Sequence, residues 1–338
     1  MVEVGIFCST SGATPPDQIA AMGQAIEERG FAALWVPEHV LFFEEYASRY
    51  PYSEDGKITG FRSGMLDPFI ALAFLAAHTK RIRIGTAIAL VPQRAPIYTA
   101  KAVSDVDYLS GGRLNLGVGV GWLKEEFDAL GIPFADRGTR TRECIEVMKT
   151  LWCDEVSQHK GKLFTLPPSL QNPKPVQKPH PPIFFGGESE PALKRVADIG
   201  QGWIGASLMP EDMPAKLKRL DELLANAGRS RKDIKIYVMP NAPARDADRF
   251  KRYEDVGVEQ VVHMVGGRGL DELLANAGRS RKDVKIYVMP NAPARDADRF
   301  KRYEDVGVEQ VVHMVGGRGL DEFKTRLDGI AKLAGVKA

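Results

Sequence analysis

Short apolar runs alternate with longer stretches of helical periodicity through the first two thirds of the chain. The runs are mostly apolar and lack the polar alternation of a half-exposed strand, which predicts parallel strands buried on both faces. Five of them occupy residues 4–8, 32–36, 82–88, 114–120 and 182–185. Between two of these runs, residues 95–109 carry apolar side chains at helical spacing and complete a strand–helix–strand unit. The pattern predicts an α/β fold with a parallel sheet.

The last third of the chain contains one segment twice. Residues 220–269 and 270–319 are identical except for Ile234 in the first copy and Val284 in the second. Six predicted strands precede the duplication, and each copy adds a helix, a strand, a second helix and a second strand. In the first copy these elements occupy residues 220–227, 234–239, 247–256 and 260–265.

Chain length limits how both copies can be used. Without one copy the chain has 288 residues, an ordinary length for a (β/α)8 barrel. Because closure with eight strands fixes strand tilt and shear, two surplus strands cannot simply be inserted. We therefore expect residues 1–338 to form one TIM-barrel domain in which one copy completes the barrel. The other copy lies outside it or is exchanged between subunits. The alternative is that the duplication arose in cloning or sequence assembly, and which copy closes the barrel stays open.

Charge and composition favour small-molecule partners. The chain has 46 basic and 44 acidic residues, so its net charge of +2 does not favour nucleic acid or an anionic membrane. No run of 18 apolar residues occurs and the N-terminus leads directly into a strand, so we expect a cytoplasmic protein. Cys8, Cys144 and Cys153 lack CxxC spacing and the six histidines are scattered. We therefore expect neither a disulfide framework nor a metal site.

Glycines follow the two central strands. The first strand contains Gly85, and the second ends among Gly117, Gly119 and Gly121. Glycine at the carboxyl end of a strand lets a ligand approach the backbone closely, and α/β folds bind ligands at that end. The alternative is that these glycines only form tight turns and let helices pack.

Another glycine pair precedes a predicted helix. Gly186, Gly187 and Ser189 can present backbone N–H groups and a hydroxyl to a phosphate at the helix N-terminus. Alternatively, Ser189 only caps the helix. The GGRG sequence at 266–269, repeated at 316–319, follows a predicted strand in each copy and is a rival phosphate site.

Ionisable and aromatic side chains follow the strand at 32–36. Glu38 and His39 come directly after it. An imidazole can hydrogen-bond a ligand or carry a proton, whereas Glu38 either orients that imidazole or is a solvated loop carboxylate. The aromatic-rich loop at 40–64 predicts a substrate wall, or else an excursion packed by its own side chains. Glu125 is a candidate catalytic acid, with a solvated face as the alternative.

Three motifs together resemble a known family. They are WVPEH at Trp35–His39, GTAIALVPQRAPIYTAKAVSDVD at Gly85–Asp107 and LSGGRLNLGVGVGW at Leu109–Trp122. In combination and order they are similar to the bacterial-luciferase-like flavin and deazaflavin oxidoreductases. Within that superfamily they most resemble the branch that uses the deazaflavin coenzyme F420. The likeness extends from Val2 to Trp203 and implies a luciferase-like (β/α)8 barrel.

The resemblance also implies a place for most of the candidate residues. It implies that His39, with Glu38 beside it, lies against the cofactor ring. It further implies a bulge behind the ring with a non-prolyl cis peptide between Ala87 and Ile88. The other cofactor-binding residues that it implies are Thr86, Gly119 and Gly121 near the ring, and Gly186, Gly187 and Ser189 at the phosphate.

The activity that the resemblance implies is hydride transfer between coenzyme F420 and a small organic substrate, with His39 handling a proton. The nearest alternative is a monooxygenase that uses reduced FMN and oxygen. Two others are a flavin- or deazaflavin-binding protein without turnover and an unrelated barrel enzyme acting on a phosphorylated substrate. We also expect a homodimer, and exchange of the duplicated segment between its two subunits is one way to form it.

Overall fold

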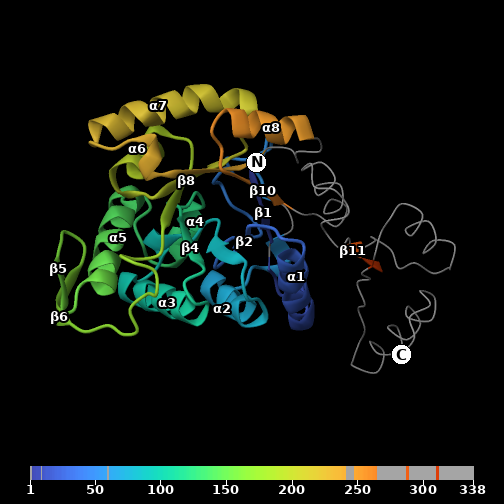
Figure 1. Ribbon diagram of the computed structural model, residues 1–338. Helices are drawn as coiled ribbons and strands as arrows, with labels where there is room; N and C mark the ends of the chain where they lie inside the picture. The colour runs from blue at the N-terminus through green and yellow to red at the C-terminus, as the bar shows by residue number, and fades with distance from the viewer. Residues whose placement is uncertain are drawn as a thin grey trace.

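A computed structural model describes residues 2–8, 10–58, 61–240 and 247–264, together with short strands at 287–288 and 310–311. Among these residues, eight parallel strands close into a barrel (Figure 1). Around the barrel the order is β1, β10, β9, β8, β7, β4, β3 and β2. These strands are β1 Glu3–Phe7, β2 Ala33–Val36, β3 Arg83–Thr86, β4 Leu114–Val118, β7 Ile183–Gly186, β8 Gly202–Ala206, β9 Lys235–Met239 and β10 Gln260–Met264. The predicted (β/α)8 fold is confirmed.

Helices surround this barrel (Figure 1), and five of the described α-helices have a proline at their first or second position. The α-helices are α1 Pro16–Glu28, α2 Pro68–His78, α3 Pro96–Leu109, α4 Lys124–Ala129, α5 Arg137–Cys153, α6 Glu190–Ile199, α7 Met213–Asn226 and α8 Ala247–Asp255. Four 3-10 turns are η1 Phe61–Ser63, η2 Val91–Gln93, η3 Pro210–Asp212 and η4 Arg231–Asp233. No described helix has both the length and the apolar character needed to cross a membrane.

The barrel interior is filled by large side chains below its carboxyl end. Trp35, Phe184 and Tyr237 are buried there, and the rings of Phe184 and Tyr237 stack with centroids 4.7 Å apart. The indole N–H of Trp35 donates to Oε1 of Gln260 at 3.0 Å, so its polar atom is satisfied. Half-buried side chains pack against this cluster, namely Phe7, Ala87, Ile88 and Met239. The filled interior leaves the carboxyl ends of the strands as the place for a site.

A hairpin lies outside the barrel. Strands β5 Ser157–Lys160 and β6 Thr165–Ser169 pair antiparallel and pack against α5. In Figure 1 the hairpin lies at the edge of the molecule beyond α5. The proline-rich stretch that follows contains cis bonds before Pro173 and Pro179.

The first copy of the duplicated segment supplies the last two barrel strands. β9 pairs with β8, and β10 pairs with β1, which closes the ring. From the second copy the structure describes β11 Tyr287–Val288 and β12 Gln310–Val311, which pair parallel with each other. The rest of the second copy and both GGRG loops lie outside the described residues. Exchange of this segment between the subunits of a homodimer stays a prediction.

Candidate functional site

The chain leaves the barrel wall after β3 and forms a bulge. The strand ends at Thr86, two residues before the predicted end, and the peptide bond between Ala87 and Ile88 is cis, as predicted. The Thr86 hydroxyl donates to the carbonyl oxygen of Gly117 at 2.6 Å, and the Ala89 N–H donates to the same oxygen at 2.8 Å. These bonds hold the bulge against β4, and Ala87 and Ile88 remain half-buried at the barrel mouth.

Two glycines after β4 leave space for neighbouring side chains. A Cβ added at Gly119 would lie 1.7 Å from Cδ1 of Ile88, which no adjustment of a few tenths of an ångström relieves. Gly121 has a φ of +81°, and an added Cβ there would lie 2.7 Å from Cε2 of Phe127. The positive φ favours glycine at position 121, and at position 119 a side chain could be added only if Ile88 moved. Close approach of a cofactor at these positions stays a prediction.

His39 lies between a carboxylate and an indole. Its Nδ1 is 3.0 Å from Oε2 of Glu126, and the Trp122 indole N–H points to its Nε2 at 3.2 Å. The indole is only a donor, so Nε2 must be the acceptor and the proton of the neutral ring resides on Nδ1. The His39 side chain is 9% exposed, and that of Glu126 is completely buried. The site thus holds an imidazole of defined orientation.

Glu126 is the carboxylate that sequence reasoning missed. Its Oε1 accepts the backbone N–H groups of Val40 at 2.7 Å and Leu41 at 3.1 Å, and its Oε2 also accepts Nε2 of Gln93 at 2.8 Å. Burial alone would raise the pKa of Glu126, but the hydrogen bonds from His39, Gln93 and Leu41 hold it below its usual value. An ionised, acceptor-only group therefore lies beside His39.

The neighbouring carboxylate, Glu125, anchors the long loop. Its Oε1 accepts the backbone N–H groups of Ala47 at 2.7 Å and Ser48 at 3.1 Å. Burial opposes ionisation, but hydrogen bonds from Ser48 and from backbone N–H groups lower the pKa of Glu125 to about 2. Leu123 and Phe127 are buried and lie four residues apart, so they mark the inner face of α4. Glu126 lies on that face, and this spacing is the sequence signal that favours Glu126 over Glu125. A substrate-side role for Glu125 stays a prediction.

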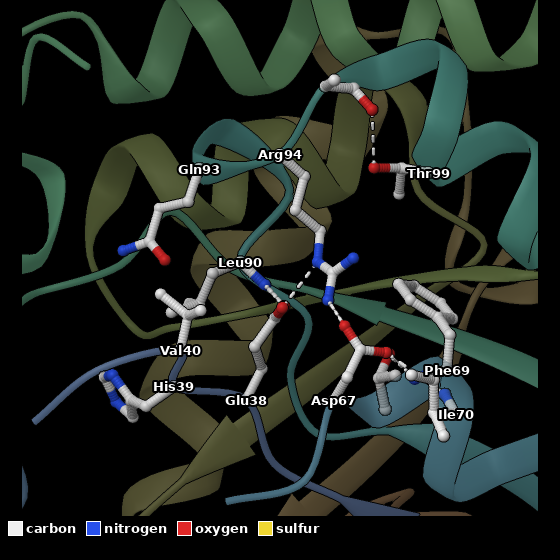
Figure 2. A network of polar contacts seen from close by, with 12 residues as sticks. Glu38, His39, Val40, Asp67, Phe69, Ile70, Leu90, Gln93, Arg94 and Thr99 are labelled. Atoms are coloured by element: carbon white, nitrogen blue, oxygen red, sulfur yellow. Dashed lines mark hydrogen bonds and ion pairs between the residues drawn. The ribbon is translucent and has the colours of Figure 1, made fainter. Parts of the chain in front are cut away.

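Glu38 does not orient His39 in this structure. Its carboxylate instead accepts the Leu90 backbone N–H and Nε of Arg94, each at 2.5 Å, as Figure 2 shows. Consecutive residues of an extended chain point to opposite sides, so Glu38 and His39 diverge. Arg94 also pairs with Asp67, whose other oxygen caps the first turn of α2. This network, in which only Glu38 is fully buried, joins the chain segments that follow β2 and β3.

Aromatic side chains of the long loop gather around His39. Phe42 lies 5.0 Å from the His39 ring centroid, while the rings of Tyr46 and Tyr50 lie 5.9 and 5.2 Å from Trp122. Tyr52 continues this series, with its ring 5.5 Å from that of Tyr50. The described part of the loop thus places aromatic side chains beside the imidazole and packs several of them against one another, and a substrate wall stays a prediction.

The predicted phosphate loop follows β7. Gly187 has a φ of +102°, and Ser189 occupies the N-cap of α6, but its hydroxyl makes no capping hydrogen bond. The Glu188 carboxylate accepts the Ala206 backbone N–H at 2.6 Å and the Tyr52 hydroxyl at 3.3 Å. Burial raises the pKa of Glu188 despite these hydrogen bonds. Phosphate binding by this loop stays a prediction.

In the described part of the chain, no group of three or more His, Cys, Asp or Glu side chains is placed to hold a metal ion. Cys8 and Cys144 are buried thiols, and Cys153 is exposed.

Comparisons with known proteins agree on one family. The family described as luciferase-like monooxygenase matches residues 2–249. An uncharacterized protein of Mycobacterium tuberculosis (strain ATCC 25618 / H37Rv) is 34% identical over 263 residues, which cover 76% of this chain and 89% of the relative. The FMNH2-dependent dimethylsulfone monooxygenase of Pseudomonas putida is 31% identical over 186 residues, covering 54% of this chain and 50% of that protein.

A solved structure extends the likeness to the fold. The coenzyme F420-dependent tetrahydromethanopterin reductase from Methanopyrus kandleri superposes with a TM-score of 0.58. The sequence identity is 19%, and the superposition covers 98% of this chain and 90% of the reductase. At this identity the likeness is one of fold.

Proposed function

Because the chain belongs to the luciferase-like monooxygenase family, we propose that it is an oxidoreductase using a deazaflavin of the F420 type. It transfers a hydride between this cofactor and a small organic substrate. The observation that supports this most is the meeting of two neighbouring strand ends, His39 after β2 and the half-exposed bulge at Ala87 and Ile88 after β3. A reactive imidazole and an apolar surface thus share one end of the barrel.

The residues at the barrel mouth fit such a cofactor. Phe7, Ala87, Ile88 and Met239 are half-buried apolar side chains, the surface that a planar ring system packs against. The hydroxyl of Ser189 makes no capping bond and remains exposed beside the N-terminus of α6, where it can meet a phosphate. When bound, a deazaflavin supplies the site that accepts or donates the hydride.

The chain itself handles the proton. In its present tautomer His39 has an unprotonated Nε2, which accepts the Trp122 indole N–H. A substrate hydroxyl that replaces Trp122 as the donor can transfer its proton to Nε2 as a hydride leaves the adjacent carbon. Because Phe42, Tyr46 and Tyr50 lie close by, they can exclude water from that step.

A monooxygenase using reduced FMN and oxygen is the second candidate. The specific observation in its favour is the P. putida relative, which is described as FMNH2-dependent and is 31% identical over the matched residues. That match covers half of the relative, so its reaction is carried over here only as an alternative.

A parallel titration with oxidised F420 and FMN tests the proposal. We expect intrinsic fluorescence to show tighter binding of F420, and a substrate screen then follows the loss of its visible absorbance. Tighter binding of FMN would favour the monooxygenase. Binding of F420 without any turnover would favour a carrier protein, and binding of neither cofactor would overturn the proposal if a variant without residues 270–319 also binds neither.

A further inference from the structure

The two ring nitrogens of His39 have different partners. Trp122 has one polar hydrogen and no acceptor, so its approach to Nε2 at 3.2 Å requires a lone pair on that nitrogen. A proton on Nε2 would set two donors against each other. The carboxylate of Glu126 offers only acceptors when ionised, and it lies 3.0 Å from Nδ1. Both contacts therefore select the same neutral tautomer, with the proton on Nδ1.

We propose that Glu126 is a positioning residue that holds His39 in the Nδ1–H tautomer and leaves Nε2 as the only nitrogen able to accept a substrate proton. The effect on turnover rests on the proposed function, whereas the tautomer itself does not. Glu126 acts through His39, so it need not touch the substrate.

Glu126 is itself held in place by three other donors. Val40 and Leu41 donate their backbone N–H groups to Oε1, which leaves Oε2 for His39 and Gln93. The carboxylate is completely buried, which shields these hydrogen bonds from bulk solvent. Rotation of the carboxylate away from His39 would break all of these bonds, and the orientation of the imidazole is fixed accordingly.

A single substitution can reverse this selection. In Glu126→Gln the amide oxygen can still accept the Val40 and Leu41 N–H groups, which turns the NH2 group towards Nδ1 of His39 and towards Gln93, whose amide must then turn to present its oxygen. Nδ1 would then have to accept, and the ring proton would move to Nε2, against the Trp122 N–H. Removing the carboxylate thus changes the tautomer with little change in side-chain volume.

The adjacent residue supplies a matched control. Glu125 lies on the same short helix, and it also accepts two backbone N–H groups of the long loop, those of Ala47 and Ser48. It makes no contact with His39 among the described interactions. Glu125→Gln therefore alters loop anchoring by the same chemical change while leaving the partner of Nδ1 intact.

The experiment is nitrogen NMR of the full chain with 15N-labelled histidine rings. The chain has six histidines, and the signals of His39 are assigned by their loss in His39→Asn. We expect wild type and Glu125→Gln to show a protonated Nδ1 and an unprotonated Nε2. In Glu126→Gln we expect the proton on Nε2 or divided between the two nitrogens.

Several results would overturn the proposal. A proton on Nε2 of His39 in the wild type would overturn the proposal by itself, even if Glu126→Gln fails to fold. An unchanged ring pattern in folded Glu126→Gln, or an equal change in Glu125→Gln, also does so. If the wild type turns over F420 with a substrate, kcat of Glu126→Gln should fall roughly 10²-fold at similar cofactor affinity. If no cofactor binds, the proposed function fails and the ring pattern still decides the role of Glu126.

Discussion

The carboxylate of Glu38 accepts the backbone N–H of Leu90 at 2.5 Å and so joins the end of β2 to the segment after β3. Arg94 extends this contact, because it pairs with both Glu38 and Asp67 at the start of α2. One buried carboxylate thus sets the relative positions of two loops that carry His39 and the Ala87–Ile88 bulge.

Replacing Glu38 should weaken the whole fold. In Glu38→Ala, the Leu90 N–H loses its acceptor while Arg94 keeps Asp67, so we expect the free energy of unfolding to fall by about 1–3 kcal/mol. Urea unfolding followed by circular dichroism measures this change. Glu44→Ala is the control, because Glu44 also pairs with an arginine but both side chains are mostly exposed. Its stability should equal that of the wild type, and an equal loss in both variants would contradict the role given to Glu38.

Gly119 and Gly138 should respond in opposite ways to the same substitution. Gly119→Ala places a methyl group against Ile88, and we expect a loss of about 1–3 kcal/mol in the free energy of unfolding. Gly138 lies in α5, and an added Cβ there meets no atom closer than 3.5 Å, so Gly138→Ala should be neutral or stabilising. The double variant Gly119→Ala/Ile88→Ala should recover part of the lost stability. If it recovers none, the contact with the Ile88 side chain is not the cause of the loss.

Trp122 should report ligand binding. The chain has four tryptophans, and Trp35, Trp152 and Trp203 are fully buried, whereas Trp122 is half-buried beside His39. We expect F420 or FMN to change tryptophan emission mainly through Trp122. Trp122→Phe should lose most of that change, and Trp152→Phe should keep it. A full signal in Trp122→Phe would place the ligand away from this side chain.

Glu126 should give stability a specific dependence on pH. Although burial opposes it, hydrogen bonding holds the pKa of folded Glu126 below the usual 4.5. The carboxylate therefore stabilises the fold above pH 4.5, and this contribution is lost as the pH falls through the lowered pKa. The difference in unfolding free energy between wild type and Glu126→Gln should shrink below pH 4.5. For Glu125, whose pKa is about 2, the corresponding difference should persist to lower pH. Urea unfolding across this range measures both differences.

Deleting either copy of the duplicated segment should give nearly the same protein. The two products differ only by isoleucine or valine at the position of Ile234, which is buried before β9. We expect both to fold as (β/α)8 barrels, with the valine product less stable by about 0.5–1.5 kcal/mol. Thermal unfolding and F420 titration of the two products check this. Failure of both to fold would show that one copy alone cannot complete the barrel.

The apolar runs predicted the barrel strands because burial on both faces leaves a plain signal in composition. The strand ends were less predictable: β3 stops at Thr86 because the chain turns into the bulge, although Ala87 and Ile88 are as apolar as a strand. The cis bond followed from the family resemblance alone, since neither Ala87 nor Ile88 is a proline.

The partners of His39 could not be derived from sequence spacing. Glu38 is adjacent in sequence but points to another loop, while Glu126 is 87 residues away and reaches the imidazole because β4 lies two strands from β2 in the barrel. The choice between Glu125 and Glu126 depends on which face of α4 packs inward, and the apolar Leu123 and Phe127 are the sequence signal for that face. One residue corresponds to about 100° of helix, so adjacent carboxylates have unrelated surroundings.

The duplication gives the barrel two chemically equivalent ways to complete its ring. Use of the second copy instead of the first would lengthen the connection after β8 by one segment, at an entropic cost of about 1 kcal/mol. Loss of one buried methylene adds about 0.5–1.5 kcal/mol. We therefore expect closure by the first copy and closure by the second copy to compete. Hydrogen exchange can measure the ratio of the two closures, because the peptides that contain Ile234 and Val284 differ in mass and can be followed separately. If both closures form, the native state of this chain would be an equilibrium between two isomers of connectivity, with the first-copy closure observed here as the favoured one.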